Sequence, residues 1–343
     1  MIYSKRMVTV VLGIAAVIAV STYCYRAVRV RAAKLSQIPA PKPYFPAGSP
    51  WTQDVSNAPL DPRSYNIVTW LDYVGGWGRS GKMQVDFTIR VLQADANTPM
   101  VPFHKGPTFY LPDSDLLSAV PLPTGGGMEG HTGYECPVDQ EDCHLIVADR
   151  AHAKLYEAWQ ANYSSGILTS TFMGVWDLNR VYPPSGRGEQ CTSADAAGFP
   201  IAPLLFNADE LASGSINHAI RFILPNPRMR RRVYVRPASH AGAPDGPLNA
   251  PPYGAHFRLK SSFDISQLSA PAQVVARALQ KYGMYLADGG NITLTAQSDL
   301  DTKAKYGEVG FGPHDLQALK VTDFEVLDSG ASIPFTGDCV RNK

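Results

Sequence analysis

The sequence of 343 residues predicts a mainly β protein: a β-sandwich or jelly-roll-like domain with one or two short helices, preceded by a single N-terminal transmembrane helix. Three observations support this prediction. Glycine (29 residues) and proline (28) are both frequent, which favours many short strands joined by turns. Short segments in which apolar and polar residues alternate, or in which all residues are apolar, recur along the chain. Apolar residues keep the spacing of a helix over one long segment only. A single long uncharged apolar run begins at Met7.

The N-terminal run extends from Met7 to Tyr25 and follows Lys5 and Arg6. It is long enough to cross a bilayer as one helix, and no small-x-small cleavage site follows it, so we expect an uncleaved anchor. The positive-inside rule alone would place the bulk of the chain in the cytoplasm. The reason is a set of basic residues after the span: Arg26, Arg29, Arg31 and Lys34.

The cysteines indicate the opposite side of the membrane. Besides Cys24 the chain has four, namely Cys136, Cys143, Cys191 and Cys339. An even number in a domain rich in glycine and proline is typical of disulfides in an oxidising, extracytoplasmic compartment such as the periplasm, the cell surface or the secretory lumen. Three pairings are open, and we prefer Cys136–Cys143 and Cys191–Cys339. A structural zinc at Cys136, Cys143 and His144 is the alternative, but the usual C-x2-C spacing is missing.

The chain divides into three parts. Residues 1–34 form the membrane anchor with its basic flank, residues 35–50 are a proline-rich, extended spacer, and residues 51–343 form one extracytoplasmic β-rich domain. Apolar residues at Val274, Val275, Ala278 and Leu279 predict a helix over 270–282, and a short acidic helix is predicted over 209–214. Residues 67–71 fit a short helix or a strand. Strands are predicted over 83–92, 144–149, 153–162, 172–178, 218–224, 232–237, 253–260, 284–287, 291–295 and 323–327.

Charge and motifs exclude several classes of function. Lys and Arg total 31 and Asp and Glu total 30, and no basic stripe interleaved with aromatic residues is present, so no nucleic-acid partner is expected. The glycine-rich segments 75–78 and 125–127 lack the context of a nucleotide-binding loop, and no G-x-S-x-G sequence is present. We therefore predict no cofactor and no metal.

The most densely polar stretch runs from Cys191 to Phe222. Asp195 lies there among small residues that would let a ligand approach closely. Together with Asp149, Glu210 or Asp288 it could supply the two carboxylates of a glycosidase. The alternative is that Asp195 only forms an Asx turn or caps a helix.

Histidines and basic residues at strand ends provide further candidates. His144, His218 and His240 each lie beside a carboxylate or an arginine. A catalytic or substrate-binding role competes with that of buried structural histidines, and a shared metal site is a third alternative that no H-x-H or H-x-x-x-H pair supports. Arg221 and Lys260 lie on predicted strands and could bind a uronate or sulfate group, or could belong to a solvated sheet face. We therefore assign catalysis to Asp195, His144, Asp149 and His218, and substrate binding to Arg221, His240, Lys260 and Asp288.

Several motifs resemble a known family. They include Thr192-Ser-Ala-Asp-Ala-Ala-Gly-Phe-Pro-Ile, His218-Ala-Ile-Arg-Phe and Pro251-Pro-Tyr-Gly-Ala-His-Phe-Arg-Leu-Lys. In these the chain from about residue 51 resembles a largely uncharacterised family of secreted bacterial and fungal β-rich proteins, often found beside carbohydrate-related modules. The resemblance implies export and a β-rich domain, and it carries no catalytic assignment. The chain departs from the family in reading Asp288-Gly-Gly instead of Asp-Asn-Gly, and in its anchor and extra cysteines.

Together these features predict a membrane-anchored, extracytoplasmic, carbohydrate-active protein. Its partners are a polysaccharide or other glycan, and the membrane through the N-terminal helix. As an enzyme it would cleave the glycan as a glycoside hydrolase or as a lyase. The alternative is a non-catalytic glycan-binding or cell-envelope structural protein that uses the same groove.

Overall fold

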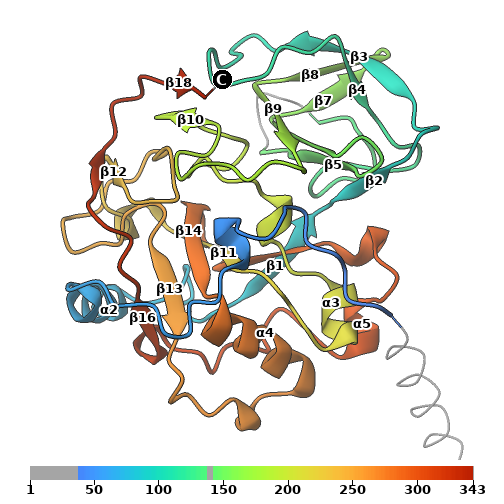
Figure 1. The fold of residues 1–343 in the computed structure, drawn as a ribbon. Coiled ribbons are helices and arrows are strands. Elements are labelled where there is room, and N and C mark those ends of the chain that lie inside the picture. Colours follow the sequence, from blue (N-terminus) through green and yellow to red (C-terminus); the bar gives the residue numbers. More distant parts are fainter. Residues whose placement is uncertain (1–37, 137–141, 343) are drawn as a thin grey trace, which may run out of the picture.

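The computed structural model describes residues 38–136 and 142–342 (Figure 1). The prediction of a mainly β fold with few helices is confirmed, since three larger sheets dominate the described chain. The predicted membrane anchor lies outside the described residues. In the part that is described, no helix combines the length and the apolar character that crossing a membrane requires.

The described residues contain four α-helices, more than the one or two expected. These are α2 (Ser64–Tyr73), α3 (Ala208–Ser213), α4 (Ala270–Lys281) and α5 (Tyr306–Val309). The helices predicted over 209–214 and 270–282 are confirmed as α3 and α4. The N-terminus of α3 has a capping box, in which Asn207 and Glu210 each accept a hydrogen bond from the other's backbone N–H. Short 3-10 helices are Pro50–Thr52, Ala202–Leu204, Asn226–Arg228, Ile265–Gln267, Asp299–Asp301 and Val321–Asp323.

The largest sheet has six strands in the order β1-β15-β11-β14-β13-β16. Its strands are β1 (Val85–Ile89), β11 (Ile220–Leu224), β13 (His256–Leu259), β14 (Met284–Gly289), β15 (Leu294–Gln297) and β16 (Phe324–Val326). The pairs β1–β15 and β11–β14 are parallel, whereas β13 pairs antiparallel with both β14 and β16. The sheet is therefore mixed.

Two four-stranded sheets form a second lobe, called the upper lobe below and shown in cyan to green at the top of Figure 1. One has the order β2-β5-β6-β9 and consists of β2 (Leu92–Ala94), β5 (Leu145–Asp149), β6 (Lys154–Trp159) and β9 (Phe172–Asp177). The other has the order β4-β3-β8-β7 and consists of β3 (Met100–Lys105), β4 (Ala119–Pro121), β7 (Asn162–Ser164) and β8 (Ile167–Ser170). Two-stranded ribbons pair β10 (Gly188–Glu189) with β18 (Val340–Arg341) and β12 (Val233–Tyr234) with β17 (Ile333–Pro334).

The jelly-roll prediction needs correction. A jelly roll is built from antiparallel strands, but each of the three larger sheets contains a parallel pair: β1–β15, β2–β5 and β3–β8. Val85 pairs with Leu294, far along the chain. The alternation of side chains within one strand shows which faces are buried and says nothing about a partner so remote.

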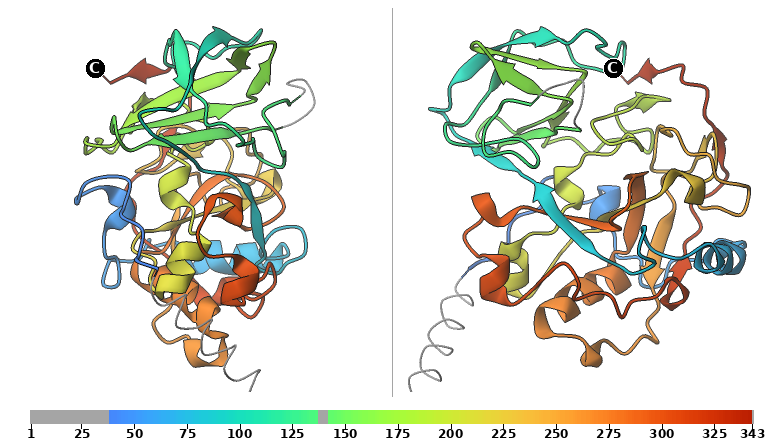
Figure 2. Two further views of the ribbon diagram at one scale, coloured as in Figure 1. Left: turned by 90° about the vertical axis from the view of Figure 1, so that its right-hand side faces the viewer. Right: turned by 180° about the vertical axis from the view of Figure 1, so that it is seen from behind.

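Strand β5 joins the two lobes into one packed unit. All five of its residues are buried. Leu145 and Val147 belong to the smaller apolar core of the upper lobe, whereas Ile146 and Ala148 belong to the large core beneath it. Successive side chains of a strand point to opposite faces, so β5 contributes to both cores. Figure 2 shows the two lobes stacked in contact.

The packed fold begins before Trp51. Phe45, in the segment expected to be a spacer, is only 6% exposed, and its ring contacts Trp176 and Tyr182 edge-on. The end of the proline-rich segment is therefore part of the domain. The aromatic side chain supplies apolar surface whose burial stabilises this arrangement.

Both preferred disulfides are confirmed: Cys136–Cys143 and Cys191–Cys339. Because Cys136 and Cys143 are bonded to each other, neither sulfur is a thiolate that could hold zinc. Two disulfides are compatible with an oxidising, extracytoplasmic location.

Candidate functional site

A cavity of about 850 Å³ lies between the upper lobe and the carboxyl ends of the parallel strands β11 and β14. Pro225–Pro227 follow β11 and line the cavity, as do Asp288 and Gly289 at the end of β14. The upper lobe contributes Tyr110 and Trp159. Ligands commonly bind at the carboxyl ends of parallel strands, so this cavity is the candidate site.

A buried ion pair lies beneath the cavity. Asp195 is fully buried; its Oδ2 accepts a hydrogen bond from Arg221 Nε (3.0 Å) and lies 2.9 Å from Nη2 in an ion pair. Arg221 Nη1 donates to Thr295 Oγ1 (2.8 Å). Burial raises the pKa of Asp195 to about 7 against the opposing effect of Arg221, and the Asp288 carboxylate adds to the rise. Asp195 does not line the cavity, so it would act on a ligand only through its neighbours.

Asp195 also shapes its own loop. Its Oδ1 accepts a hydrogen bond from Ala197 N (3.2 Å), the Asx-type contact that is the alternative to a catalytic role. Ser193 Oγ donates to the Asp195 carbonyl (2.9 Å) and to that of Phe199. The segment of small residues around Asp195, residues 191–199, is therefore a tightly bonded loop whose backbone lies at the cavity floor. It is called the central loop below.

Asp288 is the carboxylate that reaches the cavity from this network. Its side chain is 28% exposed, and its Oδ2 lies 3.7 Å from Arg221 Nη2 and accepts from Ala196 N (3.3 Å). Its Oδ1 accepts from Gly289 N (2.7 Å). Burial raises the pKa of Asp288, although Arg221 opposes the rise.

His240 lines the same cavity and contacts the same loop. Its Nδ1 donates to the Ala196 carbonyl (2.8 Å), and its ring lies 4.4 Å from that of Phe335. Because a carbonyl only accepts, Nδ1 carries the proton and Nε2 of the neutral ring has a free lone pair. Burial lowers the pKa of His240, which favours this neutral form. Nε2 has no hydrogen-bond partner among the residues that the structure describes.

Tyr253 contributes a hydroxyl that sequence reasoning missed. The residue is 1% exposed and lines the cavity. Within the described part of the chain its hydroxyl has no hydrogen-bond partner. Burial raises the pKa of Tyr253 well above its usual value, with a contribution from Asp288, so the hydroxyl keeps its proton. A lone tyrosine early in a predicted strand gives no sequence signal for such a position.

The upper lobe adds an aromatic wall with two carboxylates, Asp113 and Asp142, which sequence reasoning missed. The Tyr110 and Trp159 rings lie 5.8 Å apart at an interplanar angle of 38°. The Trp159 indole N–H donates to the Asp142 carboxylate, and Asp113 Oδ1 accepts from Thr192 N (2.7 Å). Asp113 and Asp142 belong to loops distant in sequence from the central motif, so only the fold brings them to it.

His144 supports the floor from behind. It is buried, with Nδ1 2.6 Å from Glu129 Oε2 and Nε2 3.0 Å from the Ala194 carbonyl. Burial lowers the pKa of His144, but the Glu129 carboxylate more than offsets this and raises it to about 10. The charged imidazolium thus donates to both partners and holds the central loop. His144 does not line the cavity.

Three other predicted site residues lie elsewhere. His218 donates to Glu210 Oε1 (3.1 Å) and to the Ala219 carbonyl (2.7 Å). Asp149, at the last position of β5, accepts from His152 Nδ1 (2.7 Å), and Lys260 donates to the Thr322 carbonyl (2.7 Å). None of the three lines the cavity. Of the predicted residues the structure brings together Asp288 and His240 at the cavity, with Asp195, Arg221 and His144 behind it.

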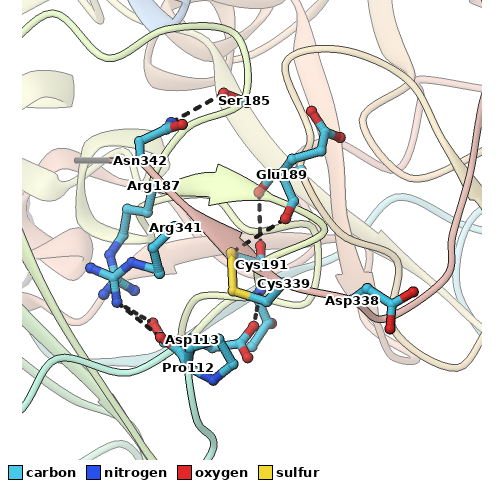
Figure 3. Close-up of a disulfide and its surroundings, with 12 residues drawn as sticks. Pro112, Asp113, Ser185, Arg187, Glu189, Cys191, Asp338, Cys339, Arg341 and Asn342 are labelled. Carbon is cyan, nitrogen blue, oxygen red and sulfur yellow. Dashed lines mark hydrogen bonds between the residues drawn. A yellow bond between two sulfur atoms is a disulfide. The ribbon is translucent and has the colours of Figure 1, made fainter.

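The C-terminal segment 333–342, which we call the strap, closes one side of the cavity with Phe335 and Gly337. Strands β17 and β18 hold it to β12 and β10, and the Cys191–Cys339 disulfide ties it to the central loop (Figure 3). Arg341 Nη2 also donates to Asp115 Oδ1 (2.6 Å). The strap is therefore a fastened wall of the cavity.

Comparison with protein-family models, with curated proteins and with solved structures finds no match to this chain. The resemblance to secreted β-rich proteins stays a prediction.

Proposed function

We propose that the protein is an extracytoplasmic, membrane-anchored, carbohydrate-active enzyme that hydrolyses a glycosidic bond, with Asp288 as general acid and His240 as general base. One observation carries the proposal. The backbone of a single residue, Ala196, donates its N–H to Asp288 and accepts at its C=O from His240. The backbone of one residue thus holds two titratable groups that both line a cavity with an aromatic wall.

The environments of the two groups suit these roles. A raised pKa lets Asp288 hold a proton closer to neutral pH, and a lowered pKa keeps His240 as a free base there. General acid–base catalysis is most effective when each group is in the required protonation state near the working pH.

The step balances as a hydrolysis. The Asp288 carboxyl proton moves to the glycosidic oxygen as the bond between that oxygen and the anomeric carbon breaks. Water attacks the anomeric carbon and gives its proton to His240 Nε2, and solvent returns the proton from His240 to Asp288. The two products together contain the atoms of the glycan and of one water molecule. The Tyr110–Trp159 wall provides faces on which sugar rings stack.

Hydrolysis is favoured over the lyase chemistry also expected from the sequence. A lyase acting on uronates must neutralise the sugar carboxylate beside the proton that is removed. Among the described residues no arginine or lysine lines the cavity. Arg221 is 3% exposed and binds Asp195 and Thr295, so it is not free to pair with a sugar carboxylate.

Two features support an extracytoplasmic, anchored setting for this activity. The disulfides are compatible with an oxidising compartment. The apolar run from Met7 to Tyr25 is long enough for one bilayer crossing. The glycan and the membrane are accordingly the proposed partners.

A second candidate function is non-catalytic glycan binding or a structural role in the cell envelope. It is favoured by the full burial of Asp195, because this carboxylate of the expected catalytic pair is satisfied by Arg221 and the loop itself. The two candidates differ in whether the glycan is broken.

Product analysis on a panel of glycans tests the proposal. The full-length protein should release fragments that carry the mass of one added water, and Asp288→Asn should lose this release. Asp72→Asn, which changes an exposed aspartate of α2, is the matched control and should behave like the wild type. Glycans that bind and remain intact would favour the non-catalytic alternative, and equal release by Asp288→Asn would remove Asp288 from the reaction.

A further inference from the structure

Among the described residues, no cation at the cavity surface balances the negative charge of the cavity. Asp113 and Asp142 line it beside Asp288, the proposed proton donor, and no lysine or arginine of the described chain does so. The remaining ionisable base, His240, has a lowered pKa and is neutral near pH 7.

The bonding of these carboxylates leaves the charge largely in place. Asp113 accepts from a backbone N–H and Asp142 from the indole of Trp159, both neutral donors. In the described part of the chain neither has an ion-pair partner. Asp288 lies 3.7 Å from Arg221, whose guanidinium pairs at 2.9 Å with Asp195. Because Asp288 carries a proton as the proposed general acid, the negative charge of the cavity is that of Asp113 and Asp142.

The Tyr253 hydroxyl is a second, independent observation that points to a ligand. It belongs to a side chain that is 1% exposed, it lines the cavity, and it has no hydrogen-bond partner among the described residues. Buried hydroxyl groups are normally hydrogen-bonded, so an unpartnered one at a cavity wall is available to a bound group. Its oxygen can accept a hydrogen bond even while it keeps its proton.

We infer that the cavity selects glycans that bear protonated amino groups. The inference rests on the proposed function and names its substrate class. An ammonium group has three hydrogens to donate, and the carboxylates together with the Tyr253 oxygen offer acceptors for them. The rings of Tyr110 and Trp159 add a surface that attracts cations. An anionic sugar, which Arg221 and Lys260 were expected to bind, would instead meet like charge.

Three tetrasaccharides of the same length and linkage type test the inference on the full-length protein. They are β-1,4-linked glucosamine, N-acetylglucosamine and mannuronate, which are cationic, neutral and anionic at pH 6. Calorimetry should show that the glucosamine tetramer binds about tenfold more tightly than the neutral one, a difference of about 1.4 kcal/mol. Added salt should narrow this difference, because it screens charges at an open site. The mannuronate tetramer should not bind measurably.

Substitutions identify the residues that cause the preference for the glucosamine tetramer. Asp142→Asn should weaken binding of the glucosamine tetramer several-fold more than binding of the N-acetyl tetramer. Tyr253→Phe, which removes one oxygen atom, should also weaken glucosamine binding. Asp72→Asn should change neither affinity, and thermal unfolding of all three variants shows whether they stay folded.

Mass analysis of the same mixtures distinguishes failure of the preference for cationic glycans from failure of the proposed hydrolysis. If the neutral or anionic tetramer binds as tightly as the glucosamine one, or if none binds, the inference is overturned. Release of neutral fragments would in that case still support the proposed hydrolysis. If glucosamine is preferred but stays intact, the charge selection stands and the proposed hydrolysis fails.

Discussion

Arg221→Met should destabilise the fold strongly. The substitution keeps an apolar stem of similar length and removes the guanidinium. Asp195 is fully buried and would then be an unpaired buried carboxylate. Thr295 would also lose the donor to its hydroxyl.

The magnitude follows from this geometry. Removing one partner of a buried ion pair costs about 3–5 kcal/mol. For a chain of this size such a loss lowers Tm by about 5–8 °C. The cost should shrink at acidic pH. Arg221 holds down the pKa of Asp195, so without it the pKa rises further above about 7 and the carboxyl is neutral at pH 5.

Urea unfolding at pH 5 and pH 8, with both disulfides kept oxidised, measures the effect. Arg277→Met, at an exposed position of α4, is the matched control and should change the free energy of unfolding by less than about 0.5 kcal/mol. The double variant Asp195→Asn with Arg221→Met should be more stable than the sum of the single losses predicts. A loss below 1 kcal/mol for Arg221→Met, or strict additivity in the double variant, would refute the reasoning.

Three further predictions concern the supports of the site. The pKa of His144 in the folded state, about 10, lies above its unfolded value. The stabilisation that protonated His144 provides is therefore complete below about pH 6.5 and is lost as the pH rises toward 10. His144→Gln should remove this part of the pH dependence of the free energy of unfolding. Replacing Cys191 and Cys339 by serine removes a disulfide between residues 148 positions apart. This should lower the free energy of unfolding by about 2–5 kcal/mol and lower the urea midpoint. In His240→Gln the acidic limb of the rate–pH profile should disappear, because protonation of His240 below its lowered pKa causes that limb; persistence of the limb would count against a base role.

Local features of the fold could be predicted because their causes are local. The apolar stripe of α4 and the acidic start of α3 are visible in a few consecutive residues, and Gly214 follows α3 with the left-handed φ of 80° that a helix end requires. The run 144–149 indicates a buried strand, which β5 is.

Pairing and convergence could not be predicted in the same way. The parallel neighbours β1 and β15 are separated by most of the chain, so no short pattern specifies them. The candidate site depends on Ala196, which contributes only backbone groups to Asp288 and His240. An alanine has no side-chain chemistry to attract notice, and the more prominent Asp195 beside it is buried. Asp195 was the natural choice from composition, and its place beneath the floor became visible only with the fold.

The most direct test of the central claim compares two leaving groups in Asp288→Asn. A general acid matters most when the departing oxygen needs a proton, and its contribution is then about 10²–10⁴-fold. Asp288→Asn should lose about this factor on an unactivated glycoside and much less on the matching nitrophenyl glycoside, whose leaving group needs no proton. The alkaline limb of the rate–pH profile should also disappear in this variant. Equal losses on both substrates, with the alkaline limb intact, would contradict the assignment of Asp288 as the acid.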